Sequence, residues 1–425
     1  MQIKLQANCL LFEKKIINMK HKVLIILVLF LSRIDVVPGQ TGLEKVKIDT
    51  SLSGKAEISL LTFDPGTEVY SVWGHTAIRI KDPANNIDEV YNYGTFDFDQ
   101  PGFVWKFLKG KLEYFLSHDP YDRVEYAYKY YKRGIHEQVL NLSTREKGRL
   151  FWLLKDNYKP EHRFYKYDFF FDNCSTRPLA IIQKSLDGNL IFKKQKSKKT
   201  FRQLLYNQIY DYKWLNFGIN LIIGNKADKY PTSFQSSFLP LILMKQMSNA
   251  KVEVKPTMKE MKSNKTVVKK MVNRERTLFE FDKVTTGIFG IFSPIWLFTF
   301  LFLLEIGIFY FSYKNGRIIY KWYDKIWFTL AFAGAIVIVF MWFFTDHQAT
   351  KNNWNLLVLN PLYLFMFFDG KWRKIFAWSI AVLLFGAIIF YSIIPQQLPP
   401  AIIPIAGLLL LKVSKYGILS RYFES

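Results

Sequence analysis

Residues 167–178 of this 425-residue chain read YDFFFDNCSTRP, and the cysteine in this stretch, Cys174, decides both the fold and the chemistry that we expect. Pro178 has no backbone N–H and is tolerated only in the first turn of a helix, so a helix should begin at or just after Cys174 and continue through Leu179 and Ile182. A cysteine at this position lies where the helix dipole favours the thiolate. The polar neighbours of Cys174 favour a nucleophile over the alternative, a small buried core cysteine.

The only other cysteine, Cys9, lies ahead of an apparent signal sequence. Residues 23–31 form an apolar run that follows a basic segment and is too short to span a bilayer, which is typical of a signal. We expect residues 1–39 to direct export, with residues 1–18 as a possible upstream extension and either cleavage before Gln40 or retention as an anchor. Structural cysteines in oxidising compartments come in pairs, so a lone exported thiol points to a nucleophile.

The C-terminal third of the chain is strongly apolar. It predicts five membrane spans, at residues 287–311, 327–344, 354–368, 375–394 and 398–411. The third and fifth are short and contain prolines, so we expect kinked or partly re-entrant segments there. Basic residues alternate between the connections in a way that leaves everything before residue 287 outside the cytosol, which is the side that the signal also predicts. Glu305, inside the first span, is either functional or paired with a neighbouring span.

Residues 40–245 predict an α+β domain. Alternating apolar residues indicate strands at 56–63, 74–81 and 89–94. Residues 121–155 are charged and aromatic at helical spacing, with a capping-box pattern that begins at Ser143. The basic segment 246–286 reads as a solvated linker, or alternatively as a surface for anionic lipid headgroups. The net charge of +23 does not indicate nucleic-acid binding, because the lysine-rich tracts at 193–199 and 245–283 lie in the part expected outside the cytosol.

A nucleophilic cysteine requires a base, and His75 is the best candidate. It follows Gly74 at the expected start of a strand, where a side chain can face a site instead of the core. Asn92, on the next strand, could orient the imidazole, with Tyr93 or Asp97 as alternatives. The Cys174 backbone N–H is the natural oxyanion donor. The aromatic run from Tyr165 to Phe171 either lines an acyl groove or packs in the core, whereas Arg163, Asp172 and Arg177 either contact a headgroup or brace the loop. No metal-ligand spacing is present, and the chemistry requires no cofactor.

Four sequence blocks carry a family resemblance: SVWGHTAIR at 71–79, YNYGTFDF at 91–98, the stretch at 167–178, and FLP at 238–240. The order of histidine before cysteine resembles the circularly permuted branch of the papain-like NlpC/P60 thiol enzymes. More specifically, the blocks resemble the Lnb family of Bacteroidota, and NWNLL at 353–357 extends the likeness into the tail. The resemblance implies a permuted NlpC/P60 papain-like periplasmic domain at 40–245 and a helical domain of about five spans at 287–425 in the inner membrane.

The resemblance also implies an activity, lipoprotein N-acylation, in which an acyl chain passes from a lipid ester through a Cys174 thioester to the α-amine of a diacylglyceryl-cysteine lipoprotein. Phospholipid and lipoprotein would be the substrates, with no cofactor and no metal. The alternatives are an NlpC/P60-like cell-wall peptidase or amidase, a membrane phospholipase, and an inactive scaffold or receptor. The expected catalytic residues are Cys174, His75 and Asn92, and the expected substrate-binding residues are Trp73, Tyr93, Asp172, Asn173 and Arg177.

Overall fold

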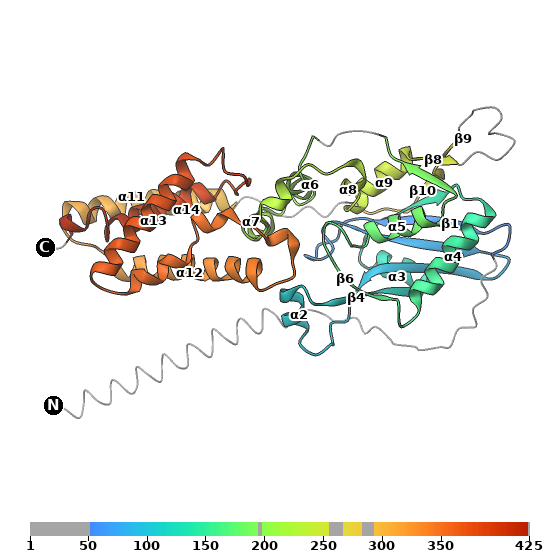
Figure 1. Ribbon diagram of the computed structural model, residues 1–425, viewed down its shortest axis with the longest axis horizontal. Coiled ribbons are helices and arrows are strands. Elements are labelled where there is room, and N and C mark those ends of the chain that lie inside the picture. Colours follow the sequence, from blue (N-terminus) through green and yellow to red (C-terminus); the bar gives the residue numbers. More distant parts are fainter. Residues whose placement is uncertain (1–51, 194–197, 255–266, 283–292, 424–425) are drawn as a thin grey trace, which may run out of the picture. The chain divides into compact units, whose positions relative to one another are not determined.

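The computed structural model describes residues 52–193, 198–254, 267–282 and 293–423. The expected signal at residues 1–39, with Cys9, lies outside the described residues. A mixed α+β region with an antiparallel sheet comes first along the chain and a helical region follows it, which confirms the predicted fold class (Figure 1). We call the first region the sheet domain and the second the bundle.

Within the described residues, the main sheet has seven strands, and every neighbouring pair is antiparallel in the order β10-β5-β1-β2-β3-β4-β6. The three strands that the sequence predicts are β1, β2 and β3. The strands of this sheet are β1 (Glu57–Phe63), β2 (His75–Asp82), β3 (Ile87–Thr95), β4 (Glu113–Pro120), β5 (Ile135–Leu140), β6 (Phe164–Lys166) and β10 (Val272–Phe279). A second sheet of three strands contains β7 (Gly188–Ile191), β8 (Lys251–Val254) and β9 (Val267–Lys270).

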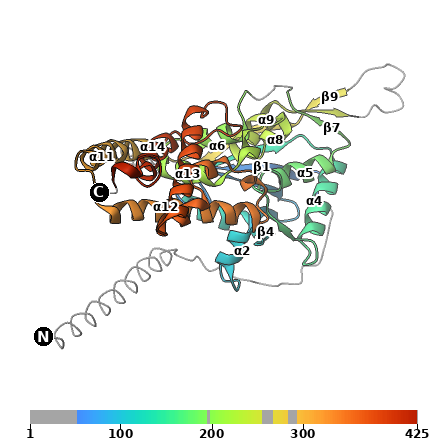
Figure 2. The same cartoon turned by 60° about the vertical axis from the view of Figure 1, so that its left-hand side comes forward.

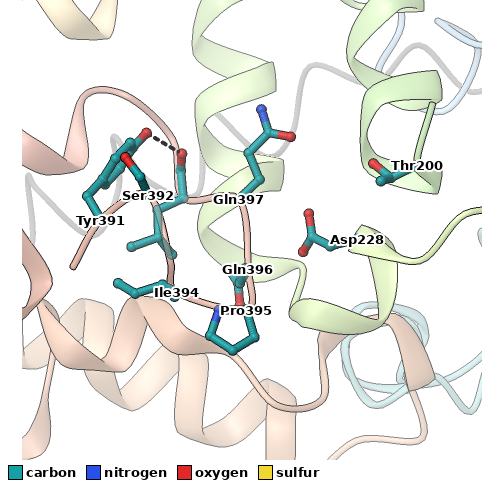
Figure 3. Close-up of a pocket in the computed structure, with 9 residues that line it drawn as sticks. Thr200, Asp228, Tyr391, Ser392, Ile394, Pro395, Gln396 and Gln397 are labelled. Atoms are coloured by element: carbon teal, nitrogen blue, oxygen red, sulfur yellow. Dashed lines mark hydrogen bonds between the residues drawn. The ribbon is translucent and has the colours of Figure 1, made fainter. Parts of the chain in front are cut away.

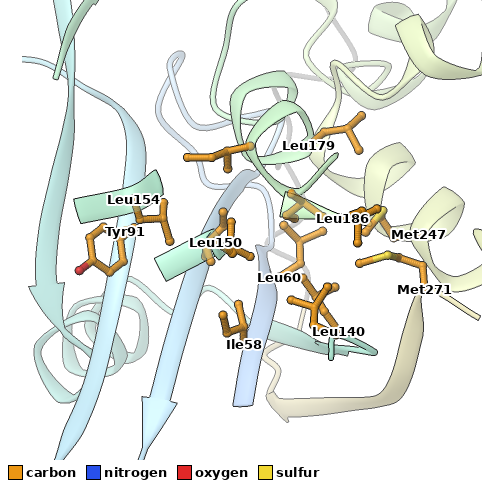
Figure 4. Close-up of a cluster of buried hydrophobic side chains, with 14 of the residues drawn as sticks. Ile58, Leu60, Tyr91, Leu140, Leu150, Leu154, Leu179, Leu186, Met247 and Met271 are labelled. Carbon is orange, nitrogen blue, oxygen red and sulfur yellow. The ribbon is translucent and has the colours of Figure 1, made fainter. Parts of the chain in front are cut away.

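Helices cover both faces of the main sheet, because β1 and β2 bury side chains on both sides. α4 (Thr144–Tyr158) and α5 (Thr176–Ser185) lie side by side on one face and form the main core there (Figures 2 and 4). The capping box at Ser143 and the helix after Cys174 are both present, as predicted. On the other face, α3 (Tyr121–Tyr130) packs on Phe63 and Val90, whereas α2 (Phe103–Lys109) buries none of its residues.

Two expectations for this region need correction. The helical pattern at 121–155 is interrupted by β5, where Glu137 and Gln138 are buried polar residues that resemble a helix surface in the sequence. Arg79 and Arg276 contact the Glu137 carboxylate at 3.4 and 2.5 Å, so the strand accommodates the charge. The expected linker at 246–286 contains strands β8, β9 and β10. Charged residues on the edge strand β10 gave this segment its linker-like composition, and edge strands favour such charges.

A group of short helices, here called the connector (residues 200–249), follows the second sheet's first strand. It contains α6 (Phe201–Gln208), α7 (Lys213–Ile222), η1 (Asn225–Asp228), α8 (Ser233–Ser236) and α9 (Pro240–Asn249). The last carbonyl groups of α7 have no partner within the helix. The side-chain amides of Asn353 and Asn355 donate to the carbonyls of Leu221 at 2.8 and 3.1 Å, and Gln396 donates to that of Ile223 at 3.1 Å. Residues of the bundle therefore cap a helix of the connector.

In the bundle, three of the described helices are long and apolar enough to cross a membrane: α11 (Pro294–Lys314), α12 (Lys321–Phe343) and α13 (Lys371–Ile389). α14 (Ile402–Ser414) is apolar but shorter, and it packs against α11 and α13. The short 3₁₀ helices are η3 (Gln348–Thr350), η4 (Trp354–Leu357), η5 (Pro361–Phe367) and η6 (Ser420–Tyr422). The third expected span is thus η4 and η5, not an α-helix, because Pro361 and the buried Asn355 and Asn360 interrupt it. The number of five crossings stays a prediction.

Four charged side chains lie fully buried inside the bundle. Glu305 on α11 and Asp324 on α12 face Lys412 and Lys415 at the end of α14. The four N–O distances run from 2.7 to 3.1 Å, and the Tyr416 hydroxyl donates to Asp324 at 3.1 Å. Two roles were expected for Glu305, a functional one or pairing with a neighbouring span. The structure shows pairing, with Lys412 and Lys415. Two acids and two lysines balance in charge, which makes their burial in an apolar region tolerable.

We predict that Lys412→Met destabilises the bundle by about 3–5 kcal/mol, because it leaves two buried carboxylates with one cation between them. The double variant Glu305→Leu/Lys412→Met keeps one acid and one lysine and should recover most of this loss. Unfolding of the full chain in mixed detergent micelles measures both effects. A single variant as stable as the unmodified protein would contradict the pairing.

Candidate functional site

Cys174 lies one residue before the N-cap of α5, on a loop that the side chain of Asn173 holds in place. The Asn173 Oδ1 accepts hydrogen bonds from the backbone N–H groups of Ser175 and Thr176, at 2.8 and 2.9 Å. Its amide nitrogen donates to the carbonyls of Phe169 and Phe238, at 2.7 and 2.9 Å. Both ends of this buried amide are therefore occupied. We assign Asn173 a positioning role in place of the expected substrate-binding role.

His75 is the first residue of β2, and the backbone around it is tightly constrained. Gly74 has a φ of +80°, and a Cβ at this position would lie only 2.7 Å from the Phe63 carbonyl oxygen. The Phe63 ring stacks on the imidazole at a centroid distance of 5.8 Å. His75 Nε2 lies 2.5 Å from Asn92 Oδ1. Since Oδ1 can only accept, this contact assigns the proton to Nε2 and leaves Nδ1 as the free base.

Cys174 and His75 approach each other at Gly94, where β3 ends. The β3–β4 register shifts between Asn92 and Thr95, and Gly94 has a φ of +93°. A Cβ built on Gly94 would lie 3.3 Å from the Cβ of Cys174 and 3.9 Å from Cε1 of His75. A bulge of this kind redirects the strand beside a site, and glycine alone accepts its backbone angle without strain. The missing side chain of Gly94 leaves open the space between the Cys174 Cβ and the edge of the imidazole.

Burial determines the protonation of both groups. Desolvation raises the pKa of the Cys174 thiol to about 11, although hydrogen bonds from the Thr76 backbone and from the side chains of Ser175 and Tyr167 favour the thiolate. Desolvation lowers the pKa of His75 to about 4, and the charge of Arg133 lowers it further against the opposing effect of Asn92. At neutral pH the pair is therefore a thiol beside a neutral imidazole. This differs from our expectation of a preformed thiolate, because desolvation outweighs the hydrogen bonds that favour the anion.

Such a neutral pair is suited to general-base catalysis, in which the imidazole takes the thiol proton as the sulfur attacks. The groups that favour the thiolate are donors, and donors of this kind can also stabilise an oxyanion next to the sulfur. Tyr167 and Thr76 are therefore additional candidates for the site. The sequence did not single them out for this role, since their proximity to Cys174 depends on the tertiary fold.

The remaining expected binding residues are held by other protein groups. Asp172 and Arg177 form a bidentate ion pair with N–O distances of 2.5 and 2.8 Å. The Arg177 guanidinium also lies 3.4 Å from the centre of the Tyr165 ring. Of the two readings offered for this pair, the contacts favour bracing of the loop. Tyr93 is buried in the core, and its hydroxyl donates to Asn157 at 2.6 Å. Trp73 packs edge-on against Phe169 of the cysteine loop, and its buried indole N–H has no hydrogen-bond partner within the described structure.

The other described histidines have contacts elsewhere. His118, His136 and His162 lie against Glu89, Asp64 and Asp156, at 2.9, 3.0 and 3.4 Å. His347 contacts the Phe107 carbonyl at 3.2 Å. Asp97, an alternative to Asn92, is exposed and accepts from the Asp99 N–H. Asn92 is thus the orienting candidate that reaches His75.

One cavity of about 360 Å³ lies apart from these residues, between the connector and the loop that follows α13 (Figure 3). Its charged side chain, Asp228, is paired with Arg202 at 2.8 Å, and Tyr391 donates to the Leu398 carbonyl at 2.9 Å. Neither Cys174 nor His75 lines the cavity. Among the described residues, no group of three or more His, Cys, Asp or Glu side chains could hold a metal ion.

We predict that Gly94→Ala lowers the stability of the protein by about 1–3 kcal/mol, because alanine is strained at a φ of +93° and its methyl group would crowd Cys174. The matched control is Gly148→Ala, inside α4, where a Cβ meets no atom within 4 Å. The control should gain about 0.5–1 kcal/mol from the better helix propensity of alanine. Thermal unfolding in detergent measures both changes, and equal effects of the two variants would contradict the assigned geometry.

The pKa values also predict how the thiol reacts with iodoacetamide. Because the pKa of Cys174 is about 11, the thiolate fraction and the alkylation rate should rise about tenfold per pH unit from pH 7 to pH 10. Glutathione in the same buffers should level off near its ordinary pKa of about 8.5. Mass spectrometry of the peptide that contains Cys174 gives the rate. A rate that is already constant below pH 7 would indicate a thiolate–imidazolium pair and contradict this reading.

Comparison with known proteins agrees with this architecture. Residues 44–207 match the Lnb N-terminal periplasmic domain, and residues 285–422 match the Lnb transmembrane domain. No curated protein and no solved structure matches the chain significantly, so the likeness to NlpC/P60 enzymes depends on the sequence blocks alone. The two matched segments together cover well over half of the sequence and follow each other in the order of the sheet domain and the bundle. The chain belongs to the Lnb family, as a membrane protein with an N-terminal periplasmic domain.

Proposed function

We propose that this protein is a lipoprotein N-acyltransferase that moves an acyl chain from a lipid ester to the α-amine of a diacylglyceryl-cysteine lipoprotein. The observation that carries the proposal is the meeting of Cys174, His75 and Asn92 at Gly94. Membership of the Lnb family and the transmembrane domain support it, because both substrates are lipids held at a bilayer surface. A soluble cell-wall peptide would not require a spanning domain.

In the first half-reaction, Nδ1 of His75 takes the thiol proton while the Cys174 sulfur attacks the ester carbonyl of the donor lipid. A C–S bond forms, and the carbonyl oxygen becomes an oxyanion. We assign its stabilisation to the Cys174 backbone N–H and the Tyr167 hydroxyl. When the tetrahedral species collapses, the ester C–O bond breaks, and the imidazolium gives its proton to the departing alkoxide. The products are a thioester on Cys174 and a lipid with one acyl chain fewer.

In the second half-reaction, the α-amine of the lipoprotein attacks the thioester carbonyl. His75, now neutral again, accepts the proton that the amine loses. The C–S bond breaks, the thiolate recovers a proton from the imidazolium, and an amide remains on the lipoprotein. The cycle returns the enzyme to its starting state and consumes no cofactor.

The partial burial of Cys174 supports transfer over hydrolysis. Desolvation is the largest cause of the raised pKa of Cys174, and only part of the residue's surface is accessible. The rings of Tyr114 and Tyr167 stack at 4.4 Å beside it. A thioester protected from water survives until an amine arrives, whereas a phospholipase requires water at the same carbonyl.

The proposal predicts the lipid content of native lipoproteins. Cells with a deletion or with Cys174→Ala should carry lipoproteins that lack the N-linked acyl chain, as measured by mass spectrometry of the amino-terminal peptide. His75→Ala should lower the rate of transfer by about 10²–10⁴-fold in purified enzyme, because it removes the base. His162→Ala, at an exposed histidine away from Cys174, is the matched control and should be fully active. N-acylated lipoprotein that persists in the deletion would overturn the proposal, and release of free fatty acid without an N-acylated product would identify a phospholipase.

A further inference from the structure

Helix α2 exposes apolar side chains that a soluble domain would bury. Val104, Trp105, Phe107 and Leu108 are all exposed, with 61% of the Val104 side chain accessible, and none of the seven residues in the helix is buried. Glycines in the left-handed conformation begin and end the helix, at Gly102 and Gly110. A surface patch of this composition needs an apolar partner.

The position of α2 identifies this partner. The Trp105 ring stacks on Phe340 near the end of the spanning helix α12, at a centroid distance of 5.7 Å. Just beyond α12, the Asp346 N–H donates to the Lys109 carbonyl at 2.9 Å, and His347 donates to that of Phe107 at 3.2 Å. Figures 1 and 2 both show α2 beside this end of α12. The patch is therefore next to the point where a transmembrane helix leaves the bilayer on the periplasmic side.

The charge of this segment fits a phospholipid surface. The charged residues between positions 100 and 112 are three lysines, Lys106, Lys109 and Lys111. Lys109 lies 4.4 Å above the Trp105 ring. Lysines that flank exposed aromatic and aliphatic side chains are typical of helices that lie in a membrane interface, where the ammonium groups meet lipid phosphates.

A row of aromatic rings leads from α2 to the thiol. Phe103, the first residue of α2, stacks with Phe96 at 5.9 Å, and Phe96 contacts Tyr114 at 5.3 Å. Tyr114 stacks on Tyr167 at 4.4 Å, and the Tyr167 ring and the Cys174 Cβ both lie within 4 Å of a Cβ built on Gly94. These four rings are half-buried, so each keeps part of its apolar surface accessible. Apolar surface thus runs from the exposed patch to the nucleophile.

We propose that α2 rests in the periplasmic leaflet and that the aromatic row from Phe103 to Tyr167 guides a phospholipid acyl chain from the bilayer to Cys174. The guidance rests on the proposed function, whereas the contact between α2 and the membrane does not. The partner is a phospholipid bilayer, and no second protein is required.

The test uses the full-length protein in vesicles of phosphatidylethanolamine and phosphatidylglycerol. One variant, Val104→Asp/Leu108→Asp, places two charges on exposed positions one turn apart. The matched control, Tyr126→Asp/Tyr130→Asp, does the same on α3, where both tyrosines are 72% exposed. A photoreactive benzophenone amino acid at position 104, or at position 126 as control, reports contact with radiolabelled phospholipid. The Cys174 thioester is measured by mass spectrometry of the intact protein, with vesicles or with water-soluble p-nitrophenyl butyrate as acyl donor.

We expect lipid cross-links at position 104 and not at 126. Val104→Asp/Leu108→Asp should slow thioester formation from vesicles by about tenfold or more, since the variant lacks two apolar side chains that would insert into the bilayer interface. Its reaction with p-nitrophenyl butyrate, and all reactions of the α3 control, should be unchanged, which also shows that the variants are folded.

The possible failures are distinguishable. If unmodified protein forms the thioester from vesicles, but position 104 gives no lipid cross-link and the α2 variant reacts equally fast, the inference is overturned and the proposed function stands. If position 104 cross-links to lipid while unmodified protein forms no thioester from any donor, the membrane contact stands and the proposed function fails. A cross-link from position 104 to the lipoprotein polypeptide in place of lipid would overturn the inference in favour of a protein-docking surface.

Discussion

The site depends on one backbone constraint, the positive φ of Gly94 at the end of β3. A side chain at this position would occupy the space between the Cys174 loop and the imidazole, since its Cβ would lie within 4 Å of both. The register of β3 with β4 also shifts at this point, between Asn92 and Thr95, as in a β-bulge. A helix terminus on one face of the sheet can thereby present its thiol to a histidine on the first residue of β2. Gly74 imposes a second constraint just before His75, because a Cβ at this position would clash with the Phe63 carbonyl oxygen.

The connector packs against both the loop of Cys174 and the bundle. Phe170 of the cysteine loop packs in one apolar cluster with Phe201, Phe238 and, at its margin, Ala349 from the loop after α12. Arg202 is buried and holds the connector together through Asp228 and the Gly224 carbonyl. The amides that cap α7 continue the same contact into η4. The loop of Cys174 is thus supported by packed rings and by the fully hydrogen-bonded amide of Asn173, as a site that must hold a reactive group in place requires.

The sequence predicted the parts of this fold that depend on local patterns. The strands β1 to β3, the capping box at Ser143 and the helix after Cys174 follow from periodicity and from residues with few backbone options. β5 was missed because its buried Glu137 is neutralised by arginines from two other strands, a pairing that exists only in the tertiary structure. The third span was taken for a helix because hydropathy does not register how Asn355 and Asn360 redirect the backbone.

For the site, residue chemistry, elimination and the family likeness together selected Cys174, His75 and Asn92. The structure brings Cys174 and His75 within 4 Å of a Cβ at Gly94 and Asn92 to 2.5 Å from His75, and their catalytic roles stay a prediction. The contacts of Asn173 favour a positioning role over the predicted substrate-binding role, and a buried asparagine that caps a helix and one that binds substrate look alike in a sequence. Sequence motifs did not predict the protonation state, since hydrogen-bond donors and desolvation shift the thiol pKa in opposite directions. Desolvation prevails, and this outcome suits the proposed acyl transfer. A thiol that is mostly protonated at neutral pH reacts slowly with electrophiles that arrive without a base beside the sulfur, and the partly desolvated environment that raises its pKa also limits the access of water to the proposed thioester.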